Sequence, residues 1–82
     1  MSRRPKEEQP LLVENAVEQL RSAAGLSRQE LAEKVGVHYQ TIGYIERGEY
    51  SPSLLLAIQI ARTLGQSVED VFWIKEWSKN GK

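Results

Sequence analysis

The chain has 82 residues, 40% of them hydrophobic, which suits one small globular domain rather than a disordered or multidomain protein. It has no cysteine and a single histidine, so disulfides, thiolate metal sites and the usual zinc clusters are excluded. The 11 basic and 11 acidic residues cancel, which argues against binding nucleic acid through bulk positive charge.

The first ten residues, MSRRPKEEQP, combine two prolines with dense charge, and we predict a disordered arm over residues 1–10. They lack the apolar stretch of a secretory signal, and no apolar run in the chain is long enough to span a bilayer. We therefore expect a cytoplasmic protein with no membrane partner.

A domain of five helices is predicted over residues 11–77, because apolar residues recur at helical spacing between capping residues. The first helix is expected over about 14–24, with an apolar face formed by Val13, Val17, Leu20 and Ala24. The second helix begins after Ser27, which forms a capping box with Glu30, and ends at Gly36.

The third helix is predicted over 38–47, the fourth over about 53–64, and a short fifth helix after the N-cap Ser67. The fourth helix is expected to turn these residues toward the core: Leu54, Leu55, Ile58, Ala61 and Leu64. These helices follow one another with short connections, as expected for an all-α domain.

Residues 28–47, RQELAEKVGVHYQTIGYIER, have the pattern of two short helices joined by a tight turn. The small Ala32 allows close approach of the two helices, and Gly36 relieves strain at the turn. Seven positions fit this corner: Leu31, Ala32, Val35, Gly36, Val37, Ile42 and Ile45. A corner without a DNA role is the alternative, but the match favours a helix-turn-helix whose second helix enters the DNA major groove.

Three phrases within residues 14–74 resemble the lambda repressor/Cro family of helix-turn-helix regulators, also called the xenobiotic-response-element type: LSRQELAEKVGV, QTIGYIERGEYSPSL and LGQSVEDVF. The resemblance implies a five-helix, lambda-repressor-like domain that binds double-stranded operator DNA as a homodimer. We also favour a short β-ribbon formed by the segments before helix one and after helix five.

The resemblance places the base-contacting positions at Tyr39, Gln40, Thr41 and Tyr44. An amide such as that of Gln40 can pair with adenine through two hydrogen bonds, and Thr41 can contact a base or a phosphate. Solvent-facing or core-edge aromatics are the alternative for the two tyrosines. His38 stands where the family usually has a serine or threonine N-cap, so we expect a weakly capped third helix.

The resemblance also implies contacts to the DNA backbone from Ser27, Arg28, Gln29, His38, Arg47, Tyr50, Ser51 and Ser53. For Arg28 the alternative is a solvated surface charge. The resemblance also implies that Arg21 and Glu46 form a partly buried structural ion pair. Gly43 is expected on the exposed side of the third helix, where close approach of the DNA backbone would explain it.

The C-terminal residues Trp73, Ile74 and Trp77 are too apolar for a free tail. They either fold back onto the core or form a strand that pairs with residues 11–13 and builds a dimer interface. We favour the second interpretation, with a dimerisation segment over 72–77 and a tail over 78–82.

We therefore predict a sequence-specific DNA-binding transcriptional regulator, a repressor that binds a palindromic operator as a homodimer. The alternatives are an antitoxin-like or adaptor protein with a protein target, and a purely structural helical module. No nucleophile–base pair, metal ligand set or phosphate loop is visible, so we expect no enzyme activity, cofactor, metal or small-molecule ligand.

Overall fold

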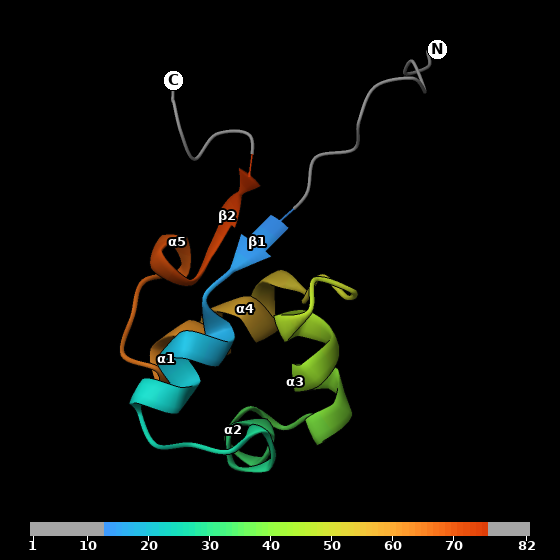
Figure 1. Cartoon of the computed structure of the whole chain (residues 1–82), viewed down its shortest axis with the longest axis vertical. Helices are drawn as coiled ribbons and strands as arrows, with labels where there is room; N and C mark the ends of the chain where they lie inside the picture. Colours follow the sequence, from blue (N-terminus) through green and yellow to red (C-terminus); the bar gives the residue numbers. More distant parts are fainter. Residues whose placement is uncertain (1–12, 76–82) are drawn as a thin grey trace.

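The computed structural model describes residues 13–75, which form five helices and a two-stranded ribbon. The elements in chain order are β1 (Val13–Asn15), α1 (Val17–Ala23), α2 (Arg28–Val35), α3 (Tyr39–Glu46), α4 (Leu54–Thr63), α5 (Val68–Val71) and β2 (Phe72–Ile74). The helices gather into one body, and the ribbon extends from one end of it (Figure 1). The predicted five-helix fold with a β-ribbon is confirmed. None of the described helices combines the length and apolar content needed to cross a bilayer.

The ribbon is antiparallel and pairs Val13 with Ile74 and Asn15 with Phe72. This corrects the predicted start of the first helix, because residues 13–15 are a strand and α1 begins only at Val17. The reason is local: the Asn15 side-chain oxygen accepts a hydrogen bond from the Val17 amide at 3.0 Å, which starts the helix there. Ala24, expected on the buried face, is exposed beyond the helix end.

The capping signals in the sequence set the start of most of the other helices. The predicted capping box forms, because the Glu30 amide donates to Ser27 Oγ at 3.0 Å and the Ser27 amide donates to Glu30 Oε1 at 2.8 Å. Ser53 caps α4 and Ser67 caps α5, in each case through the hydroxyl oxygen, which accepts a hydrogen bond from a backbone amide. Gly36 ends α2 at φ 78°, a left-handed conformation that glycine adopts without strain.

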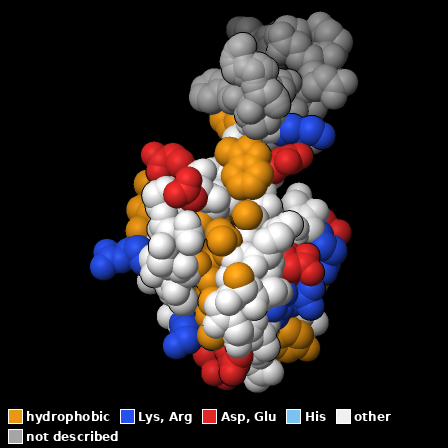
Figure 2. All heavy atoms as spheres, turned by 60° about the vertical axis from the view of Figure 1, so that its left-hand side comes forward, with side chains coloured by type: hydrophobic (Ala, Val, Ile, Leu, Met, Phe, Trp, Pro, Cys, Tyr) orange, Lys and Arg blue, Asp and Glu red, His pale blue; other side chains and the backbone are white. Residues whose placement is uncertain are grey.

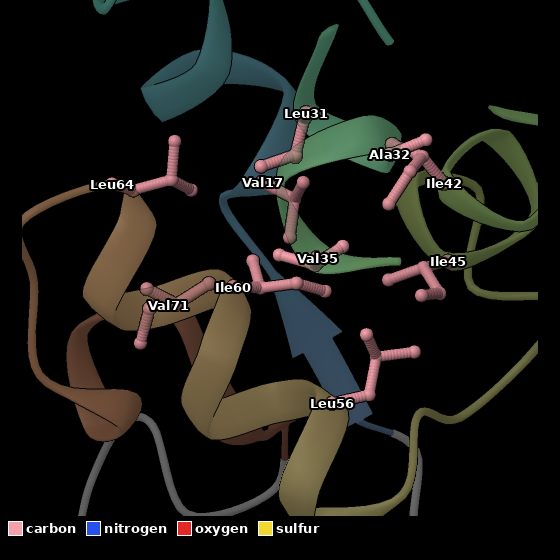
Figure 3. Packing of buried hydrophobic residues seen from close by; sticks show 11 residues of the cluster. Val17, Leu31, Ala32, Val35, Ile42, Ile45, Leu56, Ile60, Leu64 and Val71 are labelled. Atoms are coloured by element: carbon pink, nitrogen blue, oxygen red, sulfur yellow. The ribbon is translucent and has the colours of Figure 1, made fainter. Parts of the chain in front are cut away.

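The core lies where the five helices meet (Figure 3). The largest fully buried side chains are Leu31, Ile42, Ile45, Ile60, Val17 and Val71. Of the seven positions predicted to shape the corner, five are buried, Val37 is partly buried against them, and Gly36 makes the turn. The apolar spacing of residues 28–47 therefore predicted the packing of α2 against α3 correctly.

The buried face of α4 differs from the predicted one. The helix turns inward with Leu56, Ala57, Ile60, Ala61 and Leu64. Leu54, Leu55 and Ile58 are instead 73%, 67% and 36% exposed. The run LLLAI is apolar on every side of a helix, so spacing alone could not select the face that packs against α2 and α5. The correction leaves an apolar patch of three side chains at the start of α4.

Candidate nucleic-acid interface

One face of α3 is fixed in the core and the other is open to solvent. Ile42 and Ile45 are buried, while Tyr39 and Tyr44 are 47% and 44% exposed. Gln40 is also exposed, and Thr41 is half-buried. The four predicted base-contacting residues thus lie on or beside the outward side of a helix that the core holds rigidly. The two tyrosines are surface residues and not members of the buried cluster.

The start of α3 is capped by an imidazole ring. His38 Nδ1 accepts a hydrogen bond from the Gln40 amide at 3.1 Å. The ring nitrogen thus takes the place of the serine or threonine hydroxyl that usually caps this helix, and the strength of this cap stays a prediction. The His38 ring also stacks on Tyr39 with 4.6 Å between centroids, which restrains the tyrosine. The other ring nitrogen, Nε2, can donate a hydrogen bond outward when Nδ1 is the acceptor.

Glu46, at the end of α3, accepts from two arginines. Arg21 Nε lies 2.7 Å from Glu46 Oε2, and Arg28 Nε lies 2.8 Å from Glu46 Oε1. The Glu46 side chain is only 2% exposed, whereas that of Arg28 is 47% exposed. Hydrogen bonding to Glu46, and then its charge, raise the pKa of Arg28 above its ordinary value. Arg28 is therefore an oriented, permanently charged surface group.

Gly43 is buried, and this corrects its predicted place on an exposed side. A Cβ at this position would lie 3.3 Å from Arg47 Nη1 and 3.8 Å from Arg28 Cδ. The glycine is covered by these two arginine side chains, which is why it is not open to solvent. A hollow of about 260 Å³ lies here, lined by Arg28, Tyr39, Gln40, Gly43, Tyr44 and Arg47.

Arg47 is held by two neighbours on the surface. Its guanidinium carbon lies 5.2 Å from the centroid of the Tyr44 ring, within the range of a cation–π interaction. Its Nε lies 3.3 Å from Glu49 Oε2. Both contacts keep the guanidinium near the hollow beside α3.

The other predicted backbone-contacting residues lie at the starts of α2 and α4. Ser27 and Gln29 are exposed at the start of α2, and Tyr50, Ser51 and Ser53 are exposed between α3 and α4. The hydroxyl oxygens of Ser27 and Ser53 accept from backbone amides, so their O–H groups remain donors. Helix starts with such donors suit a phosphate.

Asn15 connects the ribbon to α3, a role that sequence reasoning missed. Its Nδ2 donates to the Ile45 carbonyl at 2.9 Å, across 30 positions of sequence. No local pattern identifies such a contact, because it depends on how the ribbon packs. Of the residues predicted for the dimer interface, Trp73 and Ile74 are half-buried in β2, and Trp77 lies outside the described residues.

Comparison with known proteins places these features in a family. A family model described as helix-turn-helix matches residues 17–71. A Bacillus subtilis protein named as an uncharacterized HTH-type transcriptional regulator, YgzD, is 47% identical over 64 residues, which cover 78% of this chain and 97% of the relative. The chain belongs to the helix-turn-helix family of transcriptional regulators.

Solved structures support the same assignment for this helix-turn-helix regulator. The clp gene regulator ClgR from Corynebacterium glutamicum is similar with a TM-score of 0.63 and 31% identity, over 66% of this chain and 57% of ClgR. SinR, described as the master regulator for biofilm formation and solved in complex with DNA, has a TM-score of 0.60 and 35% identity. That match covers 65% of this chain and 86% of the SinR chain.

Among residues 13–75 of the regulator, no group of three or more histidine, cysteine, aspartate or glutamate side chains is placed to hold a metal ion. A second hollow, of about 410 Å³, is bounded by Asn15 and Phe72 of the ribbon and by Tyr50 and Pro52 of the loop after α3.

Proposed function

We propose that α3 of this regulator lies in the major groove of operator DNA and reads bases with Tyr39, Gln40, Thr41 and Tyr44. The observation that carries the proposal is that α3 is buried on one side only. Its apolar face is fixed in the core, and its polar face is exposed. A rigid helix with outward polar side chains can bring an amide to the edge of a base pair. The solved complex of the similar protein SinR with DNA supports this assignment.

Contacts to phosphates would hold α3 in position. The starts of α2 and α4 contribute Ser27, Gln29, Ser51 and Ser53, and the helix dipoles favour an anion there. Arg28, Arg47, His38 and Tyr50 supply the remaining donors. Acidic and basic side chains are interspersed on the face shown in Figure 2, with no single basic field. Because the 11 basic and 11 acidic residues of the chain cancel, the attraction to DNA is local, and its strength depends on the few donors named above.

A homodimer would double the number of contacts. The ribbon has only two strands, so each strand of the described sheet pairs on one side and offers its other edge to a second copy. Dimers with two-fold symmetry read palindromic operators, with recognition helices about 34 Å apart. We infer that the regulator binds such an operator and represses transcription by blocking a promoter in the cytoplasm.

Titration of the protein against DNA from its own upstream region tests this function. Gln40→Ala is expected to reduce discrimination between operator and random duplex by about 1–3 kcal/mol, with unchanged circular dichroism. Gln59→Ala is the matched control, because Gln59 is an exposed glutamine on α4. Equal binding by Gln40→Ala and the parent would contradict the base contacts. Failure of the parent to bind any duplex would contradict the proposal as a whole.

A second candidate function follows from the apolar patch on α4. Leu54 and Leu55 are more than half exposed, and exposed apolar patches mark sites of protein association. An antitoxin-like or adaptor role, with a protein as the main target, would use this patch. Leu54→Ser and Leu55→Ser together would then abolish the capture of that partner and leave DNA binding intact.

A further inference from the structure

The hollow beside α3 brings two guanidinium groups to a single point. Measured from the position that a Cβ on Gly43 would occupy, Arg47 Nη1 lies at 3.3 Å and Arg28 Nε at 3.9 Å. The two arginines come from different places in the fold, one at the start of α2 and one at the end of α3. Any side chain at position 43 would occupy the space between them and the helix.

The hydrogen bonds formed within the described part of the chain leave part of each guanidinium unused. Arg28 donates from Nε to Glu46, which leaves its two terminal NH₂ groups. Arg47 directs Nε and Nη2 at Glu49, which leaves Nη1 on the side of Gly43. These donors therefore lie on the two arginine side chains that line the same hollow.

The charged side chains that line the hollow are both arginines, although the protein as a whole is neutral. Glu46 accepts from Arg21 as well as from Arg28, so one carboxylate is shared by two arginines. Glu49 and Arg47 are both more than half exposed, and such a pair is weak in water. Two cations brought together with incomplete neutralisation favour an anion between them. Planar guanidinium groups match the oxygen geometry of a phosphate.

We propose that Arg28 and Arg47 bind one and the same phosphodiester group of DNA as a clamp. Gly43 makes room for the clamp, and Glu46 is a positioning residue that fixes the direction of Arg28. This rests on the proposed DNA binding and adds three statements to it: the two arginines share a phosphate, position 43 must be small, and the clamp adjoins the base-reading Gln40. The clamp would set the depth of α3 in the groove.

The dependence of affinity on salt tests whether one phosphate is shared. The logarithm of the binding constant falls with the logarithm of salt concentration by about 0.9 for each phosphate neutralised. Binding of the full chain to a fluorescent random-sequence duplex is measured at several KCl concentrations, with the stoichiometry determined at saturation. For Arg28→Gln combined with Arg47→Gln, a shared phosphate lowers the slope by about 0.9 per bound protomer, and two separate phosphates lower it by about 1.8.

Affinities of the single variants provide a second criterion. Each is expected to weaken binding by about tenfold at low salt, as for loss of a charge-assisted hydrogen bond. The double variant is expected to lose less than the product of the two single losses, because both act on one ligand group. Arg62→Gln is the matched control, since it removes an equal charge from the exposed end of α4, and its slope should equal that of the parent.

Gly43→Ala separates binding from folding. Alanine favours a helix interior more than glycine, so the variant should be at least as resistant to heat as the parent. Its methyl group would lie 3.3 Å from Arg47 Nη1, so this group must shift by a few tenths of an ångström, and affinity for the duplex should fall, but no further than in Arg47→Gln. Unchanged affinity of Gly43→Ala, or a slope change near 1.8 in the double variant, overturns the clamp. If the parent binds duplexes and the variants give either of these results, only the clamp is wrong. If the parent binds no duplex, the proposed function itself fails.

Discussion

Glu46 belongs both to the core and to the proposed DNA-facing surface. Its carboxylate is nearly inaccessible to water, yet it holds one arginine that is buried and one that is exposed. A buried charge must be paired, because removing it from water without a partner is costly. The two arginines therefore have different roles although both contact the same group. Arg21 satisfies the buried charge, and Arg28 is oriented by it.

We predict that the loss of unfolding free energy is several times larger in Arg21→Ala than in Arg28→Ala. Arg21 also donates from Nη1 to the Leu26 carbonyl at 2.9 Å, so its loss leaves two buried acceptors poorly satisfied and should cost about 3 kcal/mol. Loss of the exposed Arg28 should cost less than about 1 kcal/mol. Urea unfolding followed by circular dichroism measures both. Equal losses would show that the carboxylate does not distinguish its two partners.

His38 gives a second prediction for a single residue. Replacing it by alanine removes the acceptor for the Gln40 amide and should lower the free energy of unfolding by about 1 kcal/mol. His38→Asn restores a good N-cap acceptor without the ring, and its stability should stay close to that of the parent. Thermal unfolding of the three proteins compares them. A loss in His38→Asn as large as in His38→Ala would assign the effect to the stack on Tyr39.

The elements show which parts of the fold the sequence could predict. Helix starts at Ser27, Ser53 and Ser67 were predictable because a cap and its amide partner are close in sequence. The corner of α2 and α3 was predictable because its apolar residues have an unambiguous spacing. The sequence predicted a β-ribbon, but the extension of its first strand to Asn15 and the inward face of α4 depend on packing between distant segments. For the same reason the sequence could not predict that two arginine side chains pack over Gly43.

Asn15 joins two elements, and its substitution should affect both. Asn15→Ala removes the bonds to the Ile45 carbonyl and to the Val17 amide, and we expect a loss of about 1–3 kcal/mol in stability. Asn15→Asp keeps only an acceptor, so the Val17 amide should stay protected from hydrogen exchange while the connection to α3 is lost. Exchange measured by NMR at Val17 distinguishes the two variants. Equally fast exchange of this amide in both would contradict the assigned role of the side-chain oxygen.

At the scale of the whole molecule, two apolar surfaces compete for a second copy of the chain. The ribbon offers open strand edges, with Trp73 and Ile74 half-buried on it, and the start of α4 offers Leu54 and Leu55. They differ in what they provide, because a strand edge supplies backbone hydrogen bonds as well as side-chain contacts. Asn15 ties the ribbon to α3, so a dimer formed through the ribbon would also fix the orientation of the two recognition helices.

We therefore predict that Trp73→Lys abolishes the proposed dimer and leaves a monomer, and that Leu55→Lys does not. Both variants place the same charge on an apolar surface, so the comparison isolates position from chemistry. Sedimentation velocity at high micromolar concentration gives the oligomeric state, and circular dichroism checks that each variant is folded. Dissociation by Leu55→Lys alone would move the interface to α4. A monomeric parent would remove the basis for a palindromic operator, because one copy carries one recognition helix and reads one half-site.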